Sequence, residues 1–276
     1  MPRPCYSRLE IPRKSGDDAV LGWLSLFDPL GFEVAGKDLV AFYREADNAR
    51  QASNRLRQAG VRHELTTDIP EGDPLEVYRA QSRAFPVGRR LWIDPGDDAG
   101  SEPPDARIAL RLPASRAFGT GTHASTRLAL LALEEEDLDG RSVLDVGTGS
   151  GVLALASAAL GARFAVGLDT DPEAVFVARE NLGRHPFGGR VHLYAGPLEA
   201  CVGDFDLVVA NMLSEELLPE GRRILARAGR RGRVVLSGIT RDQEAGVLGR
   251  LRTGRWKLAG RRSEEEWSCL CLSRAS

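Results

Sequence analysis

Lysine is scarce in this chain of 276 residues: among its 37 basic residues only Lys14, Lys37 and Lys257 are lysines, and the rest are arginines. An arginine excess can indicate nucleic-acid binding, but here 39 acidic residues balance the basic ones. The balance also holds locally, with 17 basic and 18 acidic residues in 1–117 and 20 and 21 in 118–276. No run of five like charges occurs. We therefore expect no direct binding to nucleic acid.

Cysteine pairs and long apolar runs are also missing. The four cysteines (Cys5, Cys201, Cys269 and Cys271) form no CxxC pair, so we expect neither a zinc site nor any other metal. Cys269 and Cys271 would point to the same face of a strand. No stretch of about 20 apolar residues could span a membrane, and the first residues lack the apolar core of a signal peptide. These absences predict a cytoplasmic protein without a membrane partner.

The length predicts two domains, since a domain takes roughly 100–200 residues. We assign residues 1–66 to a small α+β domain, because apolar spacing and turn residues predict the order βαββαβ of a ferredoxin-like fold. The expected strands are 5–11, 32–35, 39–43 and 61–66, and the expected helices are 17–27 and 46–59. Residues 67–117 are rich in proline and are interpreted as a connector that packs partly on the second domain.

Residues 118–276 predict an α/β domain with a mostly parallel sheet, because strands and helices alternate regularly. Expected strands include 142–146, 164–169, 191–194, 207–210 and 233–237, with helices between them. Two further strands, 256–260 and 267–272, follow one another directly and predict an antiparallel hairpin at the edge.

A glycine-rich turn follows the strand 142–146. Gly147, Gly149 and Gly151 have the spacing GxGxG, which differs from the GxGxxG of dinucleotide folds, and Asp145 precedes them. Such a turn lets the backbone approach a ligand at a helix N-terminus, although it could also be an ordinary tight connection. Asp169 ends the next strand, where an acid can accept hydrogen bonds from both hydroxyls of a ribose. It could instead be a helix-start acid, a role that Asp171 before Pro172 fits better.

Asn211 ends the apolar strand 207–210, at the edge of the sheet where α/β proteins bind ligands. Its amide oxygen could accept a hydrogen bond from a substrate amine and orient the lone pair of that amine. The alternative is an N-cap for the following helix, for which Ser214 is the better candidate. His123 could act as a base or contact a lid, but we favour a histidine at a helix start, satisfied by neighbouring backbone.

Four segments together carry a specific resemblance: AFGTGTHAST at 117–126, DVGTGSG at 145–151, GLDTDP at 167–172 and VVAN at 208–211. The chain closely resembles the PrmA family of lysine methyltransferases, which act on ribosomal protein L11. The similarity covers about residues 70–272. It implies a seven-stranded, Rossmann-like class I methyltransferase domain that uses S-adenosylmethionine, behind a small ferredoxin-like domain that recognises the ribosomal protein substrate.

The resemblance also implies roles for individual residues. The residues implied to bind the cofactor are Thr126, Asp145, Gly147, Gly149, Gly151, Asp169, Leu198 and Asn211. Phe118, Thr120 and Thr122 would lie in a loop over the active site, and Asn211 would be the catalytic residue. No Asp stands where an acid would bind the adenine amino group, so backbone near Leu198 would serve. The chain departs from the family at Ala124, where a proline is usual, and lacks its W-x-x-x-W connector.

Other functions remain open. The substrate could be a different protein lysine, as in the related electron-transfer flavoprotein methyltransferases, a small molecule or RNA. A different class of function is a module that binds S-adenosylmethionine without turnover. The balanced charge of residues 1–117 speaks against RNA, because phosphate binding requires a basic face. Our working expectation is a monomer that methylates a protein of the large ribosomal subunit.

Overall fold

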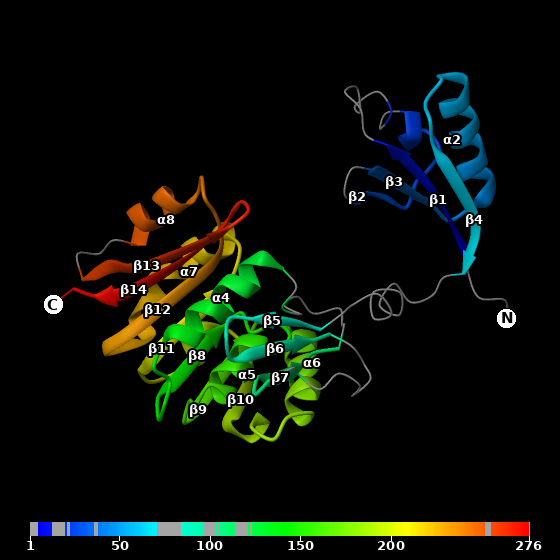
Figure 1. Ribbon diagram of the computed structural model, residues 1–276. Coiled ribbons are helices and arrows are strands. Elements are labelled where there is room, and N and C mark those ends of the chain that lie inside the picture. Colours follow the sequence, from blue (N-terminus) through cyan, green and yellow to red (C-terminus); the bar gives the residue numbers. More distant parts are fainter. Residues whose placement is uncertain are drawn as a thin grey trace. The chain divides into compact units, whose positions relative to one another are not determined.

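A computed structural model describes residues 5–12, 20, 23–35, 38–70, 84–95, 103, 105–113, 121, 123–251 and 255–275. The chain divides into two compact units, Met1–Val77 and Tyr78–Ser276 (Figure 1). The division falls inside the stretch 67–117 that the sequence predicts to be a connector.

The first unit contains a four-stranded antiparallel sheet in the order β2-β3-β1-β4. Its elements are β1 (Cys5–Pro12), β2 (Gly31–Ala35), β3 (Asp38–Tyr43), α2 (Ala46–Gln58) and β4 (Glu64–Pro70). The expected helix over 17–27 is helical at residues 20 and 23–25, and its other predicted residues before 23 lie outside the described part. Leu24 from this segment is fully buried with Leu9 and Tyr43, whose hydroxyl donates to the Leu24 carbonyl at 3.3 Å. The order is that of the predicted ferredoxin-like sandwich.

The last strand of this unit begins later than predicted, at Glu64 instead of Val61, because the end of α2 uses the intervening residues. Gly60 has φ +70° and donates its N–H to the Arg57 carbonyl, and the Val61 N–H donates to the Leu56 carbonyl at 2.9 Å. These two bonds form a Schellman closure of the helix. The backbone through Val61 therefore belongs to the end of α2, and β4 begins only after it.

The second unit starts with a small three-stranded sheet of β5 (Phe85–Val87), β6 (Leu91–Asp94) and β7 (Ile108–Arg111). The buried side chains of this sheet, with Leu112 just after it, belong to one hydrophobic core shared with helices on one face of the large sheet (Val87, Leu91, Ile93, Leu110 and Leu112). The Glu134 carboxylate accepts the backbone N–H groups of Arg89 and Arg90 in the turn before β6. This stretch thus belongs to the second unit.

The large sheet has seven strands in the order β10-β9-β8-β11-β12-β14-β13 (Figure 1). Its strands are β8 (Ser142–Val146), β9 (Phe164–Asp169), β10 (Val191–Ala195), β11 (Phe205–Asn211), β12 (Ala228–Thr240), β13 (Trp256–Glu264) and β14 (Trp267–Arg274). The first five pair in parallel, and β14 lies antiparallel between β12 and β13. The predicted closing hairpin is confirmed, with its second strand on the inside.

Alternating side chains assign the helices to the two faces of this sheet. Val143, Val209 and Cys271 point into a core with α4 (Ala124–Glu135) and α5 (Val152–Ala159). Their neighbours Leu144, Val208 and Leu270 point into a second core with α7 (Ser214–Arg227) and α8 (Glu244–Leu251). The helix α6 (Pro172–Gly183) contributes Leu182 to the first core. Both thiols of Cys269 and Cys271 lie in that first core, as expected from their spacing.

The fold is therefore the predicted α/β arrangement: a doubly covered, mostly parallel sheet and a separate small α+β unit. Among the described helices none is both long and apolar enough to cross a bilayer. Within the same described ranges, no group of His, Cys, Asp or Glu side chains is arranged to hold a metal ion.

Candidate functional site

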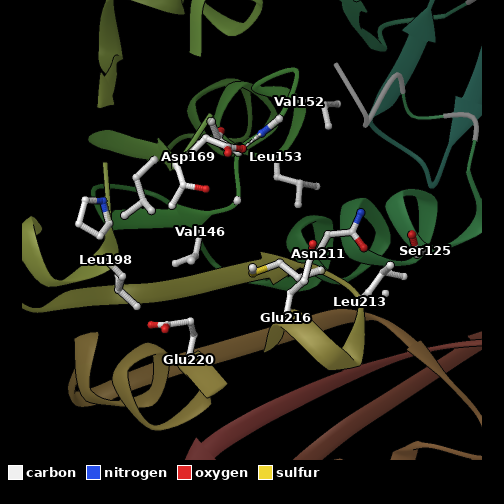
Figure 2. A pocket seen from close by; sticks show the side chains of 18 of the residues that line it. Ser125, Val146, Val152, Leu153, Asp169, Leu198, Asn211, Leu213, Glu216 and Glu220 are labelled. Carbon is white, nitrogen blue, oxygen red and sulfur yellow. Dashed lines mark hydrogen bonds between the residues drawn. The ribbon is translucent and has the colours of Figure 1, made fainter. Parts of the chain in front are cut away.

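A cavity of about 630 Å³ opens where β8, β9 and β11 end at the carboxyl edge of the large sheet (Figure 2). This volume is typical of small-molecule sites, and the edge is where α/β sheets bind ligands. Five of the predicted site residues line it: Gly147, Gly149, Asp169, Leu198 and Asn211. The lining does not include Thr126, Asp145 or Gly151. Thr126 and Asp145 are fully buried. The predicted loop residues Phe118, Thr120 and Thr122 lie outside the described residues.

At two positions of the glycine turn the backbone packs so closely against a neighbouring residue that a side chain would not fit. Gly147 has φ +71°, and a Cβ there would come within 3.2 Å of the Met212 Cγ. Gly151 caps α5 with φ +82°, and a Cβ there would come within 3.0 Å of the Ala178 Cβ. A side chain at either position would be strained in its backbone and crowded by a neighbour. The glycines therefore let the turn pack closely against Met212 after β11 and let the start of α5 pack against α6.

Asp169 lies at the tip of β9 and is anchored by backbone. Its Oδ2 accepts the Gly149 N–H at 2.9 Å, and its Oδ1 accepts the Asp171 N–H at 3.0 Å. The helix α6 is capped instead by Asp171, which accepts the Glu173 N–H at 2.8 Å. Asp171 is thus the helix-start acid that the sequence favoured, and the Asp169 carboxylate is held at the cavity wall with lone pairs to spare.

Asp145 is fully buried beneath the glycine turn. Its Oδ2 accepts the Thr148 hydroxyl at 2.7 Å and the Ala154 N–H at 3.1 Å, whereas its Oδ1 has no partner among the described residues. Burial, helped by the nearby charge of Asp169, raises the pKa of this carboxyl to about 7, although the hydrogen bonds from Thr148 and Ala154 lower it. A cation or an N–H donor that binds beside the unpartnered Oδ1 would stabilise the ionised form of this buried carboxyl.

The Asn211 amide has a fixed orientation. Its Nδ2 donates to the Thr126 hydroxyl at 3.1 Å, and Thr126 is fully buried on α4. The Asn211 Oδ1 is buried and has no partner within the described part of the chain. This leaves a hydrogen-bond acceptor ready at the cavity wall. Thr126, expected to touch the cofactor, here contacts Asn211, and its contact with the cofactor stays a prediction.

The predicted Ser214 cap is wrong. Leu213 is the N-cap of α7 and makes no side-chain cap bond, and Ser214 is the first helical residue. The reason is that the chain after β11 is pinned early: the Met212 N–H donates to the Ser237 carbonyl, and Gly238 packs on the Met212 backbone. With Met212 fixed, the helix begins one residue sooner. Asn211 is not a cap either, which leaves its amide for another use.

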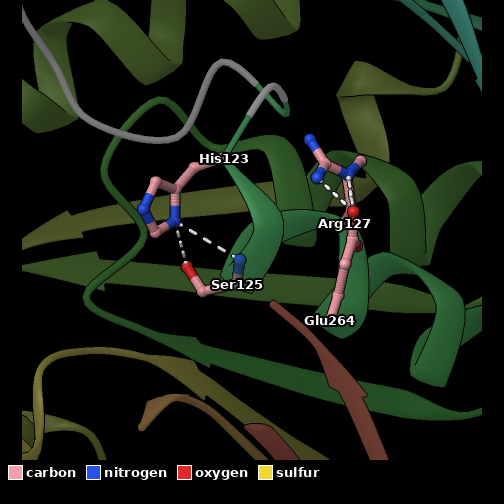
Figure 3. Close-up of polar contacts among 4 residues, drawn as sticks. All are labelled: His123, Ser125, Arg127 and Glu264. Carbon is pink, nitrogen blue, oxygen red and sulfur yellow. Dashed lines mark hydrogen bonds and ion pairs between the residues drawn. The ribbon is translucent and has the colours of Figure 1, made fainter. Parts of the chain in front are cut away.

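His123 caps α4 (Figure 3). Its Nδ1 lies 3.3 Å from the Ser125 backbone nitrogen and 2.8 Å from the Ser125 hydroxyl, so the helix-start interpretation is confirmed. The ring also lines the cavity and meets Trp267 edge-on at 4.8 Å. One turn into the helix, Arg127 forms an ion pair with Glu264 at the end of β13. These contacts hold the helix that carries Thr126.

Several lining residues were not identified from the sequence. Trp267 lines the cavity because β14 folds back between β12 and β13, which a local pattern does not reveal. Met212 lines it because it directly follows Asn211 at the end of β11. Glu216 and Glu220 line it from one face of α7. Their spacing of four residues was the available signal, since it puts both side chains on one side of a helix.

Known proteins are similar to this chain along most of its length. The family described as ribosomal protein L11 methyltransferase (PrmA) matches residues 31–275. A ribosomal protein L11 methyltransferase of Pelobacter propionicus is 40% identical over 218 residues, which cover 77% of this chain and 70% of the relative. One of Neisseria meningitidis is 35% identical, covering 84% and 78%. The crystal structure of a ribosomal protein L11 methylase from Lactobacillus delbrueckii subsp. bulgaricus matches with a TM-score of 0.64 and 31% identity, covering 71% of this chain and all of that one.

Proposed function

The chain belongs to the ribosomal protein L11 methyltransferase (PrmA) family, and from that premise we propose that it methylates lysine amino groups of this ribosomal protein. S-adenosylmethionine is the methyl donor. When bound it supplies a methyl group already activated on a positively charged sulfur, so the protein mainly contributes alignment.

The acidic groups in the cavity wall and beneath the glycine turn fit this cofactor. The unpartnered Oδ1 of Asp145 suits its ammonium group, and the Asp169 carboxylate suits its ribose hydroxyls. The glycine turn would pass beneath the methionine and ribose portions, because the cavity there is walled by backbone of Gly147 and Gly149. These residues would hold the cofactor at the carboxyl edge of the sheet.

One observation carries the proposed transfer to an amine: the free, buried Oδ1 of Asn211. An amine must be neutral to attack, and a lysine with its ordinary pKa of about 10.4 is mostly protonated at neutral pH. The apolar surroundings of the cavity favour the neutral form. Asn211 Oδ1 then accepts an N–H of that amine and turns the nitrogen lone pair toward the methyl group. No general base is required beyond water.

The test is transfer of a radiolabelled methyl group to purified ribosomal protein L11. We expect one labelled band with the wild type and a loss of about 100-fold in kcat with Asn211→Ala, because positioning accounts for most of the catalysis. Binding of S-adenosylhomocysteine to the same variant serves as the control and should persist in part, because Asn211 is one of several residues expected to contact the cofactor. Full turnover by Asn211→Ala would refute the role of the amide. Label in RNA, in solvent-soluble counts or in another protein would redirect the substrate assignment.

A further inference from the structure

We propose that Glu220 recognises the exocyclic amino group of the cofactor's adenine and so determines the specificity for an adenine base. The inference rests on the proposed use of S-adenosylmethionine. The segment 195–200 has no Asp, so backbone near Leu198 was expected to serve. Its one acid, Glu199, forms an ion pair with Arg223. The structure brings an acid to the same end of the cavity from a different element, the helix α7.

Glu220 is placed beside Leu198 by two ion pairs. Arg223 Nη1 contacts the Glu220 Oε1 at 2.8 Å and the Glu199 Oε1 at 3.0 Å, which ties α7 to the short helix η2 (Leu198–Ala200). Figure 2 shows the Glu220 carboxylate turned toward Leu198. Arg223 contacts only Oε1, which leaves the other oxygen of Glu220 without this ion pair.

That second oxygen lacks a partner. Glu220 Oε2 is buried and accepts no hydrogen bond from any described residue. Only three buried side-chain acceptors share this condition in the described part of the chain: Asp145 Oδ1, Asn211 Oδ1 and Glu220 Oε2. Two of these residues line the cavity, and the third lies beneath its glycine turn. The other unpartnered atoms are nitrogens of arginine and tryptophan residues outside the cavity lining. An unpartnered carboxylate oxygen is costly, so an N–H donor from a ligand would relieve it.

The apolar lining of the cavity indicates which kind of N–H donor fits beside Glu220. Val146, Leu168 and Leu198 line the cavity and are nearly fully buried, so they present apolar surface. A planar aromatic base fits against such side chains, whereas an ammonium or a sugar does not. Of the parts of S-adenosylmethionine, adenine alone combines an apolar face with an N–H donor at its edge. A hydrogen bond to a charged acceptor then distinguishes it from bases that carry a carbonyl there.

The test compares two ligands that differ only at this edge. S-adenosylhomocysteine carries the exocyclic amine, and S-inosylhomocysteine carries a carbonyl in its place. Calorimetry on the full chain should show the wild type preferring the adenosyl ligand by about tenfold or more. Glu220→Gln keeps the side-chain shape but can donate to a carbonyl, so its preference should fall below about threefold. Glu215→Gln makes the same chemical change on α7 outside the cavity lining and should keep the wild-type preference.

Each outcome decides a different point. Glu220→Ala, measured in parallel, should lose the preference as well and rules out an effect peculiar to glutamine. An unchanged preference in both Glu220 variants, with S-adenosylhomocysteine still bound by the wild type, would overturn this inference alone. Failure of the wild type to bind S-adenosylhomocysteine would overturn the proposed function and this inference together.

Discussion

Replacing Thr126 with valine tests whether the Asn211 amide needs its support. Valine matches threonine in shape, so the fully buried site keeps its packing while the acceptor for Asn211 Nδ2 is lost. A neutral hydrogen bond is worth about 1 kcal/mol, and a buried Nδ2 left without a partner costs about 1–3 kcal/mol. If that energy holds the amide in its reactive orientation, kcat should fall about 5- to 100-fold.

The assay is steady-state methyl transfer together with S-adenosylhomocysteine binding. A positioning residue should lower kcat and leave the affinity for S-adenosylhomocysteine unchanged, whereas direct contact with the cofactor would weaken that affinity. In an Asn211→Ala background, Thr126→Val should have no further effect, because the two residues act through one bond. A full, additive loss in the double variant would refute the reasoning.

Two further predictions concern the acids of the site. Asp169→Ala should weaken S-adenosylhomocysteine binding in calorimetry. Asp171→Ala removes the cap of α6, so it should lower the free energy of unfolding by about 1 kcal/mol and leave binding nearly unchanged. An equal loss of affinity in both variants would contradict this division of roles. Because the pKa of Asp145 is raised to about 7, the folded protein binds more protons than the unfolded one, and this group's contribution to stability should fall as pH rises from about 4 to about 7. Binding of an ammonium-bearing ligand favours the ionised carboxylate, so affinity should rise with pH up to about 7, with proton release detectable by calorimetry in different buffers. A pH-independent affinity, or the same pH dependence in Asp145→Asn, would refute this.

The elements that the sequence predicts best are those with strong local signals. The strands Ser142–Val146 and Phe164–Asp169 match their expected bounds because each is an apolar run that ends at a turn residue. Asn211 could be placed at the cavity because a parallel strand must end at the ligand edge. The Ser214 cap failed for the opposite reason: Met212 is held by β12, far away in the sequence. The four-residue spacing of Glu216 and Glu220 puts both on one side of α7, but no local pattern encodes the packing of α7 against η2.

The three unpartnered acceptors indicate a ligand site that no single segment of the sequence reveals. A folded protein rarely leaves buried acceptors unpaired, since each costs about 1–3 kcal/mol. Here Asp145, Asn211 and Glu220 come from the ends of two strands and from one helix, so three separate segments carry this cost at one place. A structural role would place donors of the chain itself opposite them, as Thr148 does for the other oxygen of Asp145. No described residue donates to their remaining oxygens, and the ammonium, the substrate amine and the adenine amine of the proposed reaction would provide one donor for each.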